Sequence, residues 1–349
     1  MVNSKKTLLS VFMSFVPFVC AGFVVGLHSY NIATDESNIV IQLVESFFSH
    51  GIFTAAVPVF LIISGYLFFR NATTIKIVFQ KQKRRIFSLL IPFLAWSLLY
   101  FLFYAIGGQF VALNQPVDFS FWGIITGILF YRYVFPMWYM FALIVFSILT
   151  PAIYGIFKLP KFVRYLVLAG IGILGILNLD ISVTIGDMER TLFAPNYFFY
   201  FLLGCILAKE PFLHDLVKKL CKLPFFVIIP LFLGAGYVSG MFFDEYWKVF
   251  NHRIMIPVVT AAFLILVTKI AMVIQEKGGK VRVIPLIPTM IIYGIHSMVG
   301  LLLTKVIGQR LPIMLSYFGI MLFNFALSSL IAVLIKKIKP LSVVFNGNR

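Results

Sequence analysis

The chain has 349 residues, of which 61% are hydrophobic and only 12% are charged, and it contains 40 phenylalanines. With a mean hydropathy of +1.01, it carries far more apolar surface than one soluble core can bury, which excludes a soluble globular protein. The apolar runs are long and continuous rather than alternating. They therefore predict transmembrane helices, each of which needs about 20 apolar residues to cross a bilayer.

Reading the apolar runs in chain order predicts an all-α, polytopic integral membrane helix bundle with about ten transmembrane helices. The stretch from Phe119 to Pro136 is also apolar, but it is short and carries Arg132, so we expect a re-entrant or interfacial segment there. The predicted spans are Leu8 to Leu27, Phe53 to Phe69, Ile86 to Ile106, Trp138 to Phe157, Tyr165 to Leu179, Phe193 to Ala208, Phe225 to Phe243, Ile254 to Ile274, Ile284 to Leu303 and Leu311 to Ile335.

The net charge of +17 is explained by topology, because cytoplasmic loops of membrane proteins are enriched in Lys and Arg. Ten spans that start from a cytoplasmic N-terminus place most of the 29 basic residues inside and most of the 12 acidic residues outside. An eleventh span at Phe119 to Pro136 would move every later loop to the opposite side of the membrane and place the basic loops outside. Both termini are therefore predicted to be cytoplasmic, in a multi-pass protein of a bacterial-type cytoplasmic (plasma) membrane.

The basic loops are expected to face the anionic inner leaflet of the lipid bilayer. We expect no nucleic-acid partner, because no soluble module gathers the positive charge. No loop is long enough for a separate domain, so residues 1–349 are predicted to form a single transmembrane domain. Cys20 and Cys205 fall in spans and Cys221 falls on the inner side, a distribution that indicates neither a disulfide framework nor a metal site.

Ionisable side chains at membrane depth are rare and usually functional. His28, within VVGLHSYN, stands at the outer end of the first span, and His296 lies about 12 residues into the ninth, which places both in the outer half of the bilayer. On the inner side, KQKRRIFSLLIPFLAWSLLY opens the third span with Arg84 and Arg85. From the residues alone, the histidines are packing residues or bases, and the arginines are membrane anchors or phosphate ligands.

Six motifs follow one another along nearly the whole chain: the first span ending in His28, VPVFLIISGYLFF (Val57 to Phe69), RIFSLLIPFLAW (Arg85 to Trp96), MWYMFALIVFSILTP (Met137 to Pro151), YFFYFLLGCILAK (Tyr197 to Lys209) and IYGIHSM (Ile292 to Met298). In this order, the motifs resemble the membrane-bound acyltransferase family 3. There is one departure: many members carry an Arg eleven residues before the first-span histidine, where this chain has Pro17.

The resemblance implies an O-acyltransferase that moves an acyl group, usually acetyl, from cytoplasmic acyl-CoA (acetyl-CoA) to a hydroxyl of an envelope saccharide or lipid-linked glycan, without a metal. In this reading, His28 is the general base, with Asp35 or Glu36 as a candidate partner, and His296 lies on the same acceptor side. A covalent acyl-His or acyl-Ser route is the alternative mechanism. Export or flipping of a polysaccharide intermediate without chemistry is the alternative function.

The remaining candidate residues are assigned to the acyl donor. Arg85, or its neighbour Arg84, is expected to hold the nucleotide end of CoA. Ser64 and Tyr66 on the second span are expected to orient the thioester or its developing oxyanion, and Trp138 packs beside it. Helix packing is the alternative role for Ser64 and Tyr66.

Overall fold

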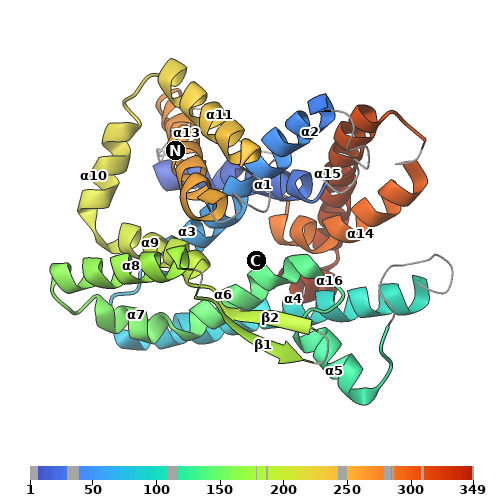
Figure 1. The fold of residues 1–349 in the computed structure, drawn as a ribbon. Helices are drawn as coiled ribbons and strands as arrows, with labels where there is room; N and C mark the ends of the chain where they lie inside the picture. Colours follow the sequence, from blue (N-terminus) through green and yellow to red (C-terminus); the bar gives the residue numbers. More distant parts are fainter. Residues whose placement is uncertain are drawn as a thin grey trace, which may run out of the picture. The chain divides into compact units, whose positions relative to one another are not determined.

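The computed structural model describes residues 7–29, 39–107, 117–177, 179–185, 188–242, 250–278, 284, 287–307 and 310–347. It is 83% helical, and the helices and strands are labelled in Figure 1. The helices are α1 (Leu8–Leu27), α2 (Ile39–Glu45), α3 (Ala56–Phe69), α4 (Ile75–Gly107), α5 (Phe121–Leu129), α6 (Trp138–Ile148), α7 (Thr150–Ile156), α8 (Lys161–Ile176), α9 (Pro195–Lys209), α10 (Pro211–Leu220), α11 (Phe225–Met241), α13 (Ile256–Glu276), α14 (Thr289–Ile307), α15 (Ile313–Lys337) and α16 (Lys339–Asn346).

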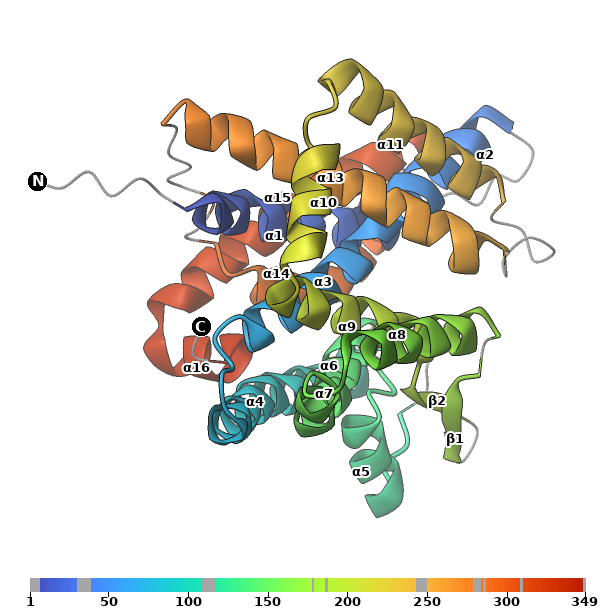
Figure 2. The ribbon, with the colours of Figure 1, turned by 90° about the vertical axis from the view of Figure 1, so that its left-hand side faces the viewer.

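The helical membrane class is confirmed. Within the described residues, six helical stretches are long and apolar enough to cross a membrane, and up to eight if each of two bent pairs is one span. The pairs are α6 with α7, bent by 52°, and α10 with α11, bent by 101°. Figure 2 shows the turn between α10 and α11. Helices α8 and α9 have 16 and 15 residues, shorter than the roughly 20 that a perpendicular crossing requires. The count of ten and the cytoplasmic termini stay predictions.

Several helix bounds differ from the predicted ones, and two differences change the local architecture. The second span is longer than Phe53 to Phe69, because the helical stretch runs without a break over Ile39–Phe69. A π-helical turn, Ser46–Gly51, and a 3-10 turn, Ile52–Ala55, join α2 to α3 within it. Polar residues had indicated a loop here, but several of them are buried against neighbouring helices.

The second difference is an antiparallel hairpin in the predicted loop before α9. Strand β1 (Ile181–Ile185) pairs with β2 (Met188–Phe193), and Val183 lies opposite Arg190. Helix α5, in the stretch rejected as an eleventh span, has only nine residues. Its length is too short to cross a bilayer, in agreement with that rejection.

Contacts group the chain into two compact units. The first contains Met1–Ser64 and Ile206–Val333, and the second contains Gly65–Cys205 and Leu334–Arg349. The assignment of the whole chain to one domain stays a prediction.

In the first unit, helices approach closely through residues without side chains. A Cβ added at Gly51 would overlap the carbonyl oxygen of Gly236 on α11, and one added at Gly240 would lie 2.5 Å from the Ser46 oxygen. Small residues at such crossings let membrane helices pack backbone to backbone. The turn Ser46–Gly51 is therefore held against α11, and α1 packs on the neighbouring α13 and α14.

In the second unit, polar groups of α4 satisfy carbonyls at the ends of other helices. Gln82 Nε2 donates to the carbonyls of Ser147 and Ile148, 3.1 and 2.8 Å away at the break between α6 and α7. Trp96 Nε1 donates to the Phe345 carbonyl on α16 over 3.2 Å. Because water is absent from the hydrocarbon region, such exposed backbone acceptors need partners inside the protein.

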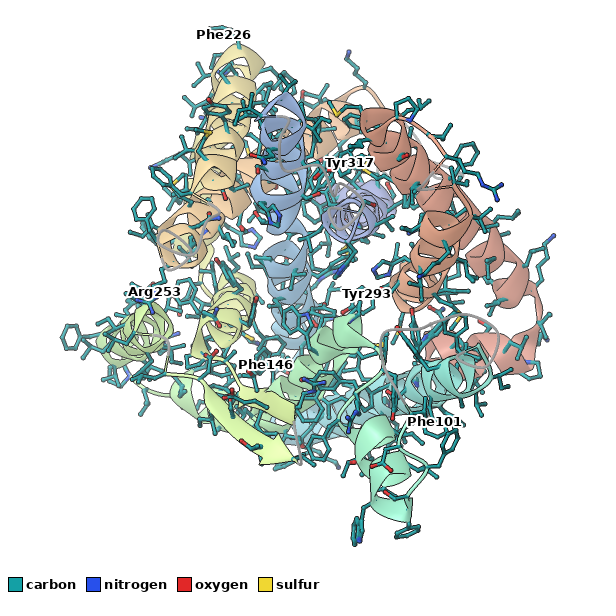
Figure 3. All side chains as sticks on the ribbon, turned by 45° about the vertical axis from the view of Figure 1, so that its right-hand side comes forward. Phe101, Phe146, Phe226, Arg253, Tyr293 and Tyr317 are labelled. Atoms are coloured by element: carbon teal, nitrogen blue, oxygen red, sulfur yellow. The ribbon has the colours of Figure 1, made fainter. Side chains whose placement is uncertain are left out.

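Aromatic rings fill the interior between α6 and α9 of the second unit. Phe146 of α6, labelled in Figure 3, lies 5.2 Å from the ring of Phe198 and 5.7 Å from that of Phe201, measured between centroids. Both distances fall in the range of favourable aromatic pairs.

Candidate active site

Two histidines from opposite ends of the sequence meet in the first unit. The ring centroids of His28 and His296 lie 5.1 Å apart, at an interplanar angle of 42°. His28 directly follows α1, and its backbone N–H still donates to the Val24 carbonyl over 3.2 Å, so the ring projects from the last helical turn. His296 lies within α14, which packs on α1. The pairing of the two helices thus brings together the two histidines that the sequence had nominated.

The His296 ring is fully buried, with 0% exposure, and its hydrogen bonds define its tautomer. Nδ1 lies 2.8 Å from the Tyr293 carbonyl oxygen, which can only accept, so Nδ1 carries a proton. In the neutral ring Nε2 is then an acceptor, and it lies 3.2 Å from the Ser297 hydroxyl. His296 is therefore held in one orientation with its basic nitrogen defined.

His28 differs from its neighbour in two respects. Its side chain is partly exposed, and within the described part of the chain no hydrogen bond engages its ring nitrogens. Asp35 and Glu36, the candidate partners for His28, lie outside the described residues. Of the two histidines, His28 is the more exposed.

A hydroxyl pair supports the end of α1 just before His28. The Ser49 hydroxyl donates to the Gly26 carbonyl over 2.9 Å. Since a serine hydroxyl has a single proton, the Tyr317 hydroxyl, 2.8 Å from Ser49 Oγ, must be the donor in that contact. Tyr317, labelled in Figure 3, belongs to α15. The last turn of α1 is thereby bonded to α15 through Ser49.

A carboxyl group is buried one helical turn before Ser49. Glu45, the last residue of α2, is 2% exposed. Its Oε1 is buried without a hydrogen-bond partner among the described residues. Such a group is unusual inside a membrane protein, where ionisable side chains mark functional regions.

The other predicted residues divide between the two units. Ser64 is buried on α3 in the first unit, with the histidines, whereas Tyr66, two residues later, belongs to the second. Arg84 is exposed and Arg85 partly buried. Both lie in α4 of the second unit, ten and eleven positions into a helix that begins before the apolar run.

Trp138, the first residue of α6, is also in the second unit, where its ring lies 4.5 Å from that of Tyr197 on α9. The structure thus brings His28 and His296 together in one unit. It places Tyr66, the two arginines and Trp138 in the other.

Four polar residues near the histidines were missed by sequence reasoning. Glu45 and Ser49 were assigned to a loop because the second span was started at Phe53. Tyr317 and Asn324 lie in the last predicted span, but no role was given to them. A signal was present, because polar residues seven positions apart lie on the same face of a helix. The missed residues are Glu45, Ser49, Tyr317 and Asn324.

A family model described as "Acyltransferase domain" matches residues 15–333. No curated protein and no solved structure matches the chain.

Proposed function

The chain belongs to membrane acyltransferase family 3 and is a multi-pass membrane acyltransferase, and from this premise we propose the reaction and the roles of its residues. The enzyme transfers an acetyl group from cytoplasmic acetyl-CoA to a hydroxyl of an envelope saccharide or lipid-linked glycan, in a bacterial-type cytoplasmic membrane. The observation that carries the proposal is the contact between His28 and His296, because two buried or half-buried imidazoles at 5.1 Å form a site suited to proton transfer.

His28 acts as the general base. Its ring is partly exposed, and no described residue occupies its nitrogens, so a neutral imidazole is available to take the proton of the acceptor hydroxyl. The resulting oxygen nucleophile attacks the thioester carbonyl carbon, and the tetrahedral intermediate collapses with cleavage of the carbon–sulfur bond. CoA leaves as a thiolate and takes the proton from the His28 imidazolium, which restores the neutral base, while the acyl group forms an ester with the acceptor.

His296 assists from the buried side. Its Nδ1 is occupied by the Tyr293 carbonyl, so the ring cannot rotate freely and presents Nε2 as an acceptor. A neutral imidazole in a fixed orientation beside His28 excludes water and holds the His28 ring in place. His296 therefore orients the base rather than replacing it.

Binding of the acyl donor, acetyl-CoA, is assigned to charged and polar residues of the family motifs. Arg85, supported by Arg84, binds the phosphates of CoA through charge-assisted hydrogen bonds. Ser64 and Tyr66 orient the thioester, and Trp138 provides an apolar wall. These roles follow the family resemblance and the position of the arginines in the basic stretch of α4 that precedes its apolar run.

The test is an acetyl-transfer assay on the purified protein in detergent. Radiolabelled acetyl-CoA is supplied with a panel of soluble saccharides and extracted membrane glycans, and CoA release and product ester are measured. His28→Ala is expected to lower kcat by about 10²- to 10⁴-fold, the usual contribution of a general base, while CoA still binds. His214→Ala, on the exposed side of α10, is the matched control and should retain activity.

Two outcomes would refute the proposal. Retained turnover in His28→Ala would exclude His28 as the base. Absence of acetyl-CoA turnover by folded wild-type protein with every acceptor would exclude the reaction and favour export of a glycan without chemistry. The donor assignment is tested separately: Arg85→Ala should weaken CoA binding, whereas Lys76→Ala, an exposed cation on the same helix, should not.

A further inference from the structure

We propose that α15 is the element that positions the two histidines, with Tyr317 and Asn324 as positioning residues for acyl transfer. The inference rests on the proposed function, in which His28 is the base and His296 orients it. Neither Tyr317 nor Asn324 touches a histidine side chain in any described contact. Each instead bonds, directly or through one serine, to the backbone of a histidine-bearing helix.

Asn324 holds the helix that carries His296. Its Nδ2 donates to the His296 carbonyl over 2.9 Å in a fully buried contact. Its Oδ1 accepts from the Ser328 hydroxyl over 3.0 Å, one turn further along α15. A side-chain amide has one acceptor end and one donor end, and both are used here, so the orientation of Asn324 is defined.

Gly300 makes room for this contact. A Cβ at position 300 would lie 2.9 Å from Asn324 Nδ2. Gly300 is one helical turn after His296 on α14, so the missing side chain leaves the His296 carbonyl accessible from α15. The close approach is local and directed at the residue that carries the imidazole.

Tyr317 holds the helix that carries His28. Its hydroxyl donates to Ser49, and Ser49 donates to the Gly26 carbonyl, two residues before His28. Tyr317 is 0% exposed, so water does not compete for these bonds. The two successive hydrogen bonds therefore link α15 to the last turn of α1.

The two anchors share one face of α15. Tyr317 and Asn324 are seven residues apart, and Ser328 follows four residues later, spacings that lie on one side of a helix. Direct packing strengthens the contact with α1, because the Phe325 ring lies 4.8 Å from that of Phe18 and fills the space left by Gly22. One rigid helix is thus bonded near both histidines, and its geometry sets their separation.

The energies involved distinguish positioning from folding. Hydrogen bonds between membrane helices contribute little to stability on average, because the unfolded state in the membrane also finds partners. A displacement of about 1 Å in a catalytic group, in contrast, can lower the rate on the order of 10²-fold. Loss of an α15 anchor should therefore change kcat far more than the melting temperature.

The experiment uses pairs of matched variants of the full chain in detergent. Ser328→Ala removes a hydroxyl that bonds to Asn324, whereas Ser329→Ala removes one with no partner among the described residues. Tyr317→Phe removes the donor to Ser49, whereas Tyr237→Phe removes a hydroxyl from a half-exposed tyrosine of α11. Asn324→Leu removes the central amide at similar volume.

With acetyl-CoA as donor, Asn324→Leu and Tyr317→Phe are expected to lower kcat at least tenfold, with KM for acetyl-CoA and the melting temperature nearly unchanged. Ser328→Ala should have a smaller effect of the same kind, and the two controls should behave as wild type. Unchanged kcat in both Asn324→Leu and Tyr317→Phe would overturn the proposal. Loss of kcat that only follows loss of folded protein would do the same.

A second readout does not depend on the reaction. In a background whose native cysteines are replaced by alanine, His28→Cys/His296→Cys is treated with a short bis-methanethiosulfonate cross-linker. Adding Asn324→Leu should lower the cross-linking rate several-fold, and adding Ser329→Ala should not. An unchanged rate overturns the positioning role. A changed rate with an inactive wild-type enzyme supports positioning and refutes only the proposed function.

Discussion

Gly65, in the ISGY segment of α3, is predicted to be a position where a single methyl group destabilises the protein. A Cβ at this position would overlap the Phe201 carbonyl oxygen and lie 3.0 Å from the Cys205 backbone nitrogen on α9. Both atoms belong to the backbone of a helix, so neither can rotate away as a side chain would. The two helices must separate to accept Gly65→Ala.

The magnitude follows from two opposing effects. In a helix interior, Gly→Ala is normally favourable by up to about 1 kcal/mol. Overpacking of a well-packed interior costs about 1 to 3 kcal/mol, and rigid backbone neighbours place Gly65→Ala toward the upper part of that range. The net result is a loss of about 1 to 2 kcal/mol of unfolding free energy relative to wild type.

Gly170→Ala is the matched control, because Gly170 lies inside α8 with no atom within 4 Å of an added Cβ. It should gain stability from helix propensity alone, so the two variants should differ by about 2 to 3 kcal/mol. The measurement is denaturant unfolding of the detergent-solubilised protein, followed by circular dichroism. If Gly65→Ala is as stable as Gly170→Ala, the backbones of α3 and α9 are not as close at Gly65 as this prediction requires.

Two further predictions concern buried groups of the described structure. The free cysteines are buried: Cys20 and Cys205 are 0% exposed, and Cys221 is 3% exposed. They should not react with N-ethylmaleimide in the native protein, and all three should react after denaturation. Rapid labelling of the native protein, measured by mass spectrometry, would contradict their burial. Trp96→Phe removes the indole donor to the Phe345 carbonyl and should destabilise the attachment of α16 by about 1 kcal/mol, the usual net contribution of one hydrogen bond. Limited proteolysis should then cleave the C-terminal helix faster than in wild type, and an unchanged rate would show that this bond is not needed.

The helical elements were largely predictable because apolar run length is a local property. The first predicted span coincides with α1, residue for residue, and its helix continues through Pro17. The prediction was weakest where polar residues interrupt the apolar pattern. Glu45 and Ser49 indicated a loop, yet both are buried in a helical stretch. This stretch packs against neighbouring helices, and hydropathy does not register such tertiary contacts.

Composition and residue order determined that this chain is a helical membrane protein, and its ordered motifs pointed to the acyltransferase family that the family match confirms. They also nominated His28 and His296, since ionisable groups in an apolar run stand out without any knowledge of the fold. Their contact at 5.1 Å was decided only by tertiary structure. The two residues are 268 positions apart in sequence, and the packing of α14 on α1, which no local pattern encodes, brings them side by side.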